Sequence, residues 1–154
     1  MQLFVTNPDP HRCSDRLYKN KTRAHKMITE TQQILACAQM HFMKKVTIKK
    51  VNGKPYTTPL SRMNHPVIRW VCEDERHASW VLEHLYHLRN AYEGNAFKNV
   101  WDNFIELSKY SPFIQDYSGI EFFNFAKADD KGLNFTHVDN TFKAYDLFLK
   151  AQDA

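Results

Sequence analysis

The chain has 154 residues, of which 43% are hydrophobic and 14% aromatic, and its formal net charge is +4. This length fits one domain, residues 1–154, and the aromatic content is too high for a disordered chain. No run of about 18 apolar residues is present and the amino end lacks a signal-peptide pattern, so we expect neither membrane association nor secretion. Three cysteines without a Cys-x-x-Cys pair are typical of a reducing, cytoplasmic environment.

The charge is divided unevenly along the chain. Residues 1–62 contain 12 Lys or Arg and 3 Asp or Glu, a net charge of +9, whereas residues 63–154 contain 9 and 14, a net charge of −5. A compact domain with one basic end attracts polyanions, of which nucleic acid is the commonest, so DNA is the expected partner. An accidental asymmetry of ordinary surface charge is the alternative.

The first predicted elements are a short β-prone stretch at Leu3–Val5 and a turn at residues 7–10, where two prolines disfavour a helix. Apolar residues recur every three or four positions over residues 22–41, which predicts a helix with one buried face. In residues 44–58 lysines alternate with β-branched residues around Asn52-Gly53, a strong turn signal, so we predict a basic β-hairpin. A flexible lysine-rich loop is the alternative, because isolated hairpins are marginally stable.

Asn64 is expected to cap a helix that begins at Pro66, since proline fits the first helical turn. Apolar periodicity predicts a long helix over residues 75–93, ended by Gly94-Asn95, and a further helix over residues 96–108. The second of these helices is expected to bury its aromatic and aliphatic side chains, which are Phe97, Val100, Trp101, Phe104 and Ile105.

Residues 113–136 are rich in aromatic residues but aperiodic, so irregular structure packed on the core is expected there. A last helix is predicted over residues 139–151. The predicted fold is mainly α, a compact single-domain helical bundle with a short basic β-hairpin.

A polar stripe is the first candidate for a functional site. Arg23, Lys26, Glu30, Gln33 and Cys37 are spaced three or four residues apart, so a helix places them on one face. Cations on this face can hold phosphates while the carboxylate acts on a proton or on a developing positive charge. The alternative is that Lys26 and Glu30 form an ordinary surface ion pair, which contributes about 0.3–0.5 kcal/mol.

The other nucleic-acid-binding candidates lie in two segments. His65, together with Asn64, stands at a helix start, where unsatisfied N–H groups attract phosphate; a capping turn beside a packed Trp70 is the alternative. The predicted hairpin supplies the remaining candidates, Lys45, Lys49 and Lys50.

Several classes of site lack their characteristic patterns. Eight histidines are present, including His84 and His87, but neither His-Glu-x-x-His nor paired cysteines occur, so we expect solvated histidines and no metal. No glycine-rich phosphate loop and no Gly-x-Ser-x-Gly elbow is present, so we expect no cofactor.

Two blocks of the sequence resemble a small-protein family of bacteriophages. The first is Met1–Thr6 with Lys26-Met27-Ile28, Glu30 and Gln33-Ile34-Leu35; the second is Asn64-His65-Pro66 with Trp70-Val71. The family is often labelled pyrimidine-dimer DNA glycosylase-like, related to phage endonuclease V, and the resemblance covers roughly residues 1–90. It implies a compact helical DNA glycosylase or glycosylase/lyase in the host cytoplasm, acting on damaged or modified bases.

The resemblance also implies residue roles. Glu30 matches the assisting glutamate of the family, and Arg23 and Lys26 would contact phosphates or the base. Family members use the amine of a small second residue as nucleophile, but residue 2 here is Gln, so the amine of Met1 or of Lys26 would replace it. The alternative function is a non-catalytic phage accessory protein that binds nucleic acid, a nucleotide or a host protein.

Overall fold

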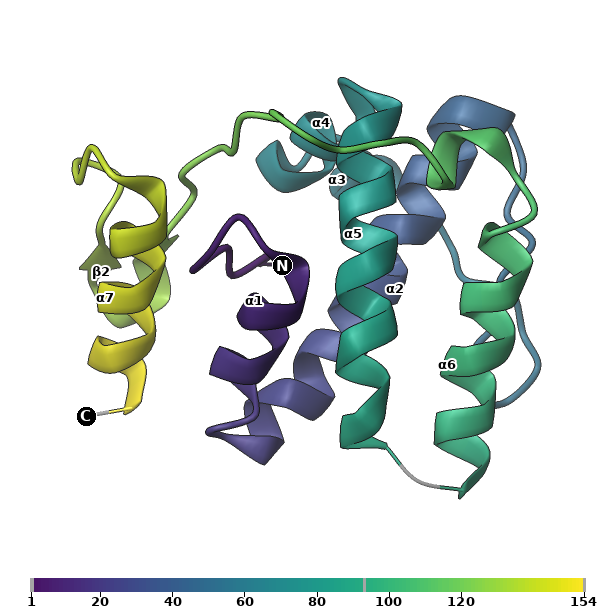
Figure 1. Cartoon of the computed structure of the whole chain (residues 1–154), viewed down its shortest axis with the longest axis horizontal. Helices are drawn as coiled ribbons and strands as arrows, with labels where there is room; N and C mark the ends of the chain where they lie inside the picture. Colours follow the sequence, from purple (N-terminus) through teal and green to yellow (C-terminus); the bar gives the residue numbers. More distant parts are fainter. Residues whose placement is uncertain (1, 93, 154) are drawn as a thin grey trace.

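Helices make up most of the chain in the computed structural model, which describes residues 2–92 and 94–153 (Figure 1). Among these residues, the α-helices are α1 (Pro10–Leu17), α2 (Lys21–Met43), α3 (Leu60–Met63), α4 (Pro66–Cys72), α5 (Glu75–Leu88), α6 (Gly94–Leu107) and α7 (Thr141–Asp153). The shorter elements are the 3-10 turns η1 (Arg89–Ala91), η2 (Ser111–Phe113) and η3 (Asp129–Lys131), with strands β1 (Lys127–Ala128) and β2 (Leu133–Asn134). The predicted mainly helical fold is confirmed.

The long helix α2 matches the helix predicted over residues 22–41. It begins where the Asn20 side chain accepts a hydrogen bond from the Arg23 N–H, and it ends at Lys44, whose φ of 60° is left-handed. Its middle part packs against α4 and α5, with no exposed surface over Ile34–Ala38. Cys37 is therefore a core residue, and its prediction as part of a polar stripe is wrong.

The helix α1 was not expected, because the prolines at residues 7–10 indicated only a turn. Pro10 instead occupies the first helical turn, where its missing N–H has no intrahelical partner to lose. The Asp9 side chain caps this turn by accepting a hydrogen bond from the His11 N–H at 2.9 Å. Asp9-Pro10 is therefore the start of a helix, with an acidic cap followed by a proline in the first turn, and not only a turn.

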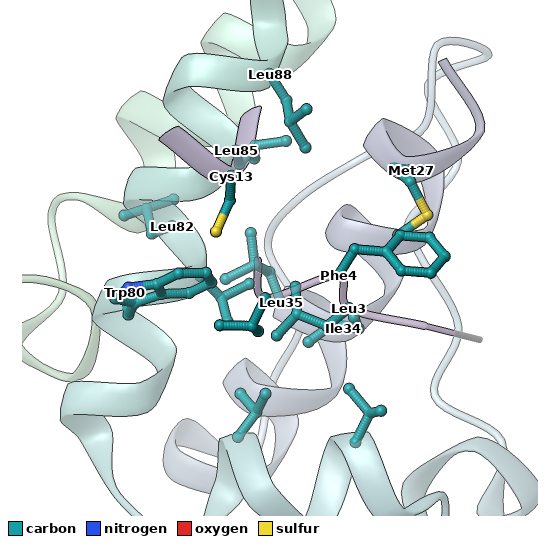
Figure 2. Close-up of a cluster of buried hydrophobic side chains, with 14 of the residues drawn as sticks. Leu3, Phe4, Cys13, Met27, Ile34, Leu35, Trp80, Leu82, Leu85 and Leu88 are labelled. Carbon is teal, nitrogen blue, oxygen red and sulfur yellow. The ribbon is translucent and has the colours of Figure 1, made fainter. Parts of the chain in front are cut away.

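The segment Leu3–Val5 forms no strand but enters the core in extended form. Its three side chains are buried, and Figure 2 shows Leu3 and Phe4 among side chains of α2 and α5. The Phe4 ring also contacts α7, with its centroid 6.3 Å from that of Tyr145 and 5.5 Å from that of Phe148. The amino-terminal segment is thus held between the helical bundle and the last helix.

The hairpin predicted over residues 44–58 is short, with one bridge between Lys49 and Pro55. Two backbone hydrogen bonds flank this bridge, from the Lys50 N–H to the Lys54 carbonyl at 2.8 Å and from the Tyr56 N–H to the Ile48 carbonyl at 3.4 Å. The outward-facing backbone groups of Lys49 bind a helix side chain instead. The buried Asn103 amide of α6 accepts from the Lys49 N–H at 3.0 Å and donates to the Lys49 carbonyl at 2.8 Å. Within the described residues, the sheet is instead the antiparallel pair β1–β2, which lies in a region expected to be irregular.

The predicted boundary between the two later helices is also different. Gly94 begins α6 rather than ending the preceding helix, and α5 passes into η1 after Leu88, while residue 93 lies outside the described residues. Trp101 and Ile105 are 37% and 42% exposed, so their predicted burial is wrong. Because α6 stands at the edge of the bundle, only one narrow stripe of it packs inward (Figure 1).

Two histidines expected in solvent are buried. The His77 ring stacks on Trp70 with centroids 4.1 Å apart, and His84 has no exposed surface. Within residues 2–92 and 94–153, no group of three or more His, Cys, Asp or Glu side chains is arranged to hold a metal ion. No helix in the same ranges is both long and apolar enough to span a membrane.

Candidate functional site

A pocket of about 520 Å³ lies between the amino-terminal half of α2, the β1–β2 hairpin and α7. Four of the residues predicted from sequence line it together: Arg23, Lys26, Glu30 and His65. The helix α2 supplies the first three from successive turns, and the start of α4 supplies the imidazole. Its volume is within the range of small-molecule sites.

Glu30 is the acidic group of the α2 side of this pocket. Its carboxyl is half-buried, and burial raises its pKa above the ordinary value of 4.5, while the positive charges of the chain's amino terminus and of Lys26 act in the opposite direction. Lys26 is exposed and forms no salt bridge with the described residues, so the simple Lys26–Glu30 ion pair is not formed here. The pocket thus combines a desolvated carboxyl with an exposed ammonium group one helical turn away.

Arg23 has a structural contact in addition to its place in the pocket wall. Its guanidinium Nη1 donates to Asp153 Oδ1 at 2.5 Å, and its side chain is only 14% exposed. This ion pair joins α2 to α7, and both helices contribute to the pocket wall. The role of Arg23 in binding nucleic acid stays a prediction.

His65 presents a neutral ring to the pocket. Its Nδ1 accepts a hydrogen bond from the Val67 N–H at 3.2 Å, so His65, rather than the expected Asn64, caps α4. Burial lowers the pKa of His65, and the positive charge of the amino terminus lowers it further. A ring whose Nδ1 is an acceptor carries its proton on Nε2, so His65 is a hydrogen-bond donor at neutral pH.

The opposite wall comes from residues that sequence analysis missed. Gln2 Nε2 donates to the carbonyls of Phe125 at 2.8 Å and Lys127 at 2.9 Å, which ties the amino-terminal segment to β1. The Lys127 ammonium lies 3.6 Å from Asp129 and above the Phe125 ring, 5.4 Å from its centroid. Asp130 and Lys131 complete this side of the pocket.

One local signal could have located the hairpin in this wall. Residues 129–132 read Asp-Asp-Lys-Gly, and glycine in a short polar run is typical of a hairpin loop. Gly132 adopts a φ of 67°, the left-handed conformation that glycine tolerates best. The pairing of this hairpin with Gln2 has no local signal, because 123 residues separate Gln2 from Phe125.

The remaining predicted residues do not join the pocket. Within the described residues its wall includes neither Gln33, which is half-buried on α2, nor Asn64, which ends α3. Residues 44–54, the lysine segment, run beside α6, across the bundle from α7 (Figure 1). The exposed side chains of this segment include the three predicted contacts, Lys45, Lys49 and Lys50. The single basic face expected from sequence is therefore two separate surfaces.

The pocket brings together groups suited to reactions that develop positive charge. The Glu30 carboxylate can stabilise a cation, the His65 Nε2–H can donate to a leaving group, and the Lys26 amine can act on phosphate or carbonyl groups. No family model, curated protein or solved structure matches this chain.

Proposed function

We propose that the protein binds DNA and cleaves the N-glycosidic bond of a damaged or modified nucleotide held in the pocket. The observation that carries this proposal is Glu30, a half-buried carboxyl of raised pKa in a pocket that also presents Lys26 and His65. When a base leaves a nucleoside, positive charge develops on the sugar, and a carboxylate of low solvation stabilises it. A base must leave the stack to reach such a pocket, so the enzyme acts on a flipped nucleotide.

The other pocket residues take complementary roles. The Nε2–H of His65 donates a hydrogen bond to the departing base, which carries away the bonding electron pair. Water adds to the C1′ cation and loses a proton, which gives the abasic sugar. In the glycosylase/lyase form, the Lys26 ammonium gives up a proton to water, and the resulting amine condenses with the C1′ aldehyde of the opened sugar and releases water, which leaves an imine. The amine of Met1, the other expected nucleophile, lies outside the described residues.

The test is incubation with duplexes that contain pyrimidine dimers, hypermodified bases or undamaged sequence, with borohydride present to reduce any imine. We expect base loss from at least one modified duplex. Glu30→Gln should lower the rate by about 100-fold or more while binding persists, since general acid–base and electrostatic groups contribute on this scale. Glu83→Gln is the matched control, a half-buried helical glutamate outside the pocket. Absence of both cleavage and trapped adduct across the panel refutes the proposal.

Peptide mapping of a trapped adduct identifies the nucleophile. Attachment at Lys26 supports the lyase step described above, and Lys26→Gln then abolishes trapping. Attachment at the amino terminus assigns the step to Met1, and cleavage without any adduct indicates hydrolysis by water alone.

A second candidate is a non-catalytic nucleic-acid-binding protein. The lysine segment favours it, because its five lysines, Lys44, Lys45, Lys49, Lys50 and Lys54, are all exposed and lie away from the pocket. This function predicts binding that weakens steeply with salt and no base loss. Failure to bind DNA or RNA at low salt would instead favour the accessory role toward a nucleotide or a host protein.

A further inference from the structure

Phe123 is an exposed aromatic residue whose ring lies beside that of Phe125, a residue of the pocket wall. Its side chain is 46% exposed, whereas most aromatic rings of the described chain are at least partly buried. Its ring lies nearly parallel to that of Phe125, at an interplanar angle of 17° and a centroid distance of 6.2 Å. Because Phe125 lines the pocket, Phe123 continues the aromatic surface from the pocket wall outward.

The backbone that carries Phe123 is held firmly. The buried Tyr145 hydroxyl of α7 donates to the Phe123 carbonyl at 3.1 Å and accepts from the Phe125 N–H at 2.9 Å. The Asn124 amide between them donates to the carbonyls of Phe135 at 3.2 Å and Val138 at 3.1 Å. The exposure of Phe123 is therefore fixed by its surroundings rather than by a loose loop.

Cations stand next to these rings, where a strand would present its phosphates. The Lys127 ammonium lies above Phe125, and Lys26 and Lys131 line the same pocket. Glu30, Asp129 and Asp130 also line it, and Asp129 lies 3.6 Å from Lys127, so the pocket is of mixed charge. Nucleic-acid strands meet such a surface with bases on aromatic rings and phosphates on cations. An exposed phenyl ring without adjacent cations would indicate an apolar partner instead.

We infer that Phe123 stacks on an unpaired nucleobase next to the nucleotide held in the pocket. This inference rests on one part of the proposed function, the binding of a nucleic-acid strand. It does not require that the protein cleaves the strand. Phe123 and Phe125 then form an aromatic platform at the pocket edge: Phe125 faces the bound nucleotide, and Phe123 supports the neighbouring base. The platform holds the strand open beside the flipped nucleotide and positions it without touching the reacting atoms.

The experiment compares two single strands of equal charge, a 12-mer of thymidine and a 12-mer of abasic tetrahydrofuran sites that no glycosylase can cleave. We expect the wild-type protein to bind the thymidine strand more tightly. In Phe123→Ala this preference should fall by about 5- to 100-fold, since base–aromatic stacking has this size. Phe123→Trp should retain the preference, and the affinity for the abasic strand should stay constant in both variants.

Ile114→Ala is the matched control, because Ile114 is 61% exposed and lies outside the pocket wall. It should bind both strands as the wild type does, and thermal unfolding confirms that each variant folds. Equal preference in Phe123→Ala and wild type, or no preference in the wild type, overturns the stacking role. If Phe123→Ala loses the preference but the protein cleaves none of the modified duplexes, the glycosylase function is refuted and the stacking role of Phe123 stands.

Discussion

Buried His84 should make the fold sensitive to acid. The imidazole of this α5 residue faces α1, where its Nδ1 lies 3.2 Å from Ser14 Oγ and 3.3 Å from the Pro10 carbonyl. The ring stacks on Trp80, and its Nε2 is buried without a hydrogen-bond partner among the described residues. A proton added to this ring would place a charge between α1 and α5 with no carboxylate beside it.

The magnitude follows from the pKa of His84, which burial lowers from 6.5 to about 4, with a smaller contribution from the charge of His87. Between these two values the unfolded chain binds a proton that the folded chain excludes, so stability rises with pH. The stabilisation is therefore complete above pH 6.5 and is lost as the pH falls toward 4. Each pKa unit corresponds to about 1.36 kcal/mol, so about 2 kcal/mol should be lost between pH 7 and pH 4.5.

The assay is urea unfolding, followed by tryptophan fluorescence, at pH 7, 5.5 and 4.5. His84→Gln should be less stable than wild type at pH 7, but its loss on acidification should be smaller by about 2 kcal/mol. His137→Gln serves as the control because His137 is exposed and lies outside α1 and α5, and it should lose as much stability on acidification as the wild type. If wild type and His84→Gln lose equal stability from pH 7 to pH 4.5, the reasoning about His84 is refuted.

Three further predictions concern α6, the lysine segment and the pocket. Asn103→Ala should lower the free energy of unfolding by about 2–3 kcal/mol in urea titrations, because it leaves the Lys49 N–H unpaired. Asn99→Ala is the control: it removes one exposed hydrogen bond to the Lys49 carbonyl and should lower the free energy of unfolding by less than about 1 kcal/mol. Lys49→Glu with Lys50→Glu should make the salt dependence of DNA binding shallower by roughly two phosphate contacts, and an unchanged slope would place the DNA elsewhere. The rate of base loss should fall as the pH drops through the raised pKa of Glu30, because the ionised carboxylate is the active form, and Glu30→Gln should lack this acidic limb.

Periodicity was sufficient for the elements with one buried face. Helix α2 and helix α7 appear where their apolar spacing indicates, because local sequence alone determines which side of such a helix packs inward. Periodicity was insufficient where contacts with other elements decide which side chains are buried. His84 lies on the same helix as apolar residues but was expected in solvent, and Trp101 was expected in the core although α6 packs at an edge.

The residues of the candidate site also fall into those that the sequence predicts and those that depend on the tertiary fold. Lys26 and Glu30 share a helix face, so their spacing predicted their proximity, and His65 was singled out as the start of a helix. The wall formed by Phe125 and Lys127 could not be predicted, because it meets α2 only through the tertiary fold. The lysine segment shows the converse: its charge was evident, but nothing in the sequence indicated that α6 would hold it away from the pocket.

The place of α7 in the pocket wall has a consequence for how the chain is made. The Arg23–Asp153 pair joins residues 130 positions apart, and the buried Phe4 contacts Tyr145 and Phe148 of the last helix. During translation the amino-terminal segment therefore leaves the ribosome long before its cover is synthesised, and contacts of such sequence separation form slowly. A nascent chain exposes the apolar surface of this segment during the interval. The pocket is therefore complete only after α7 has been synthesised and has packed against the rest of the fold.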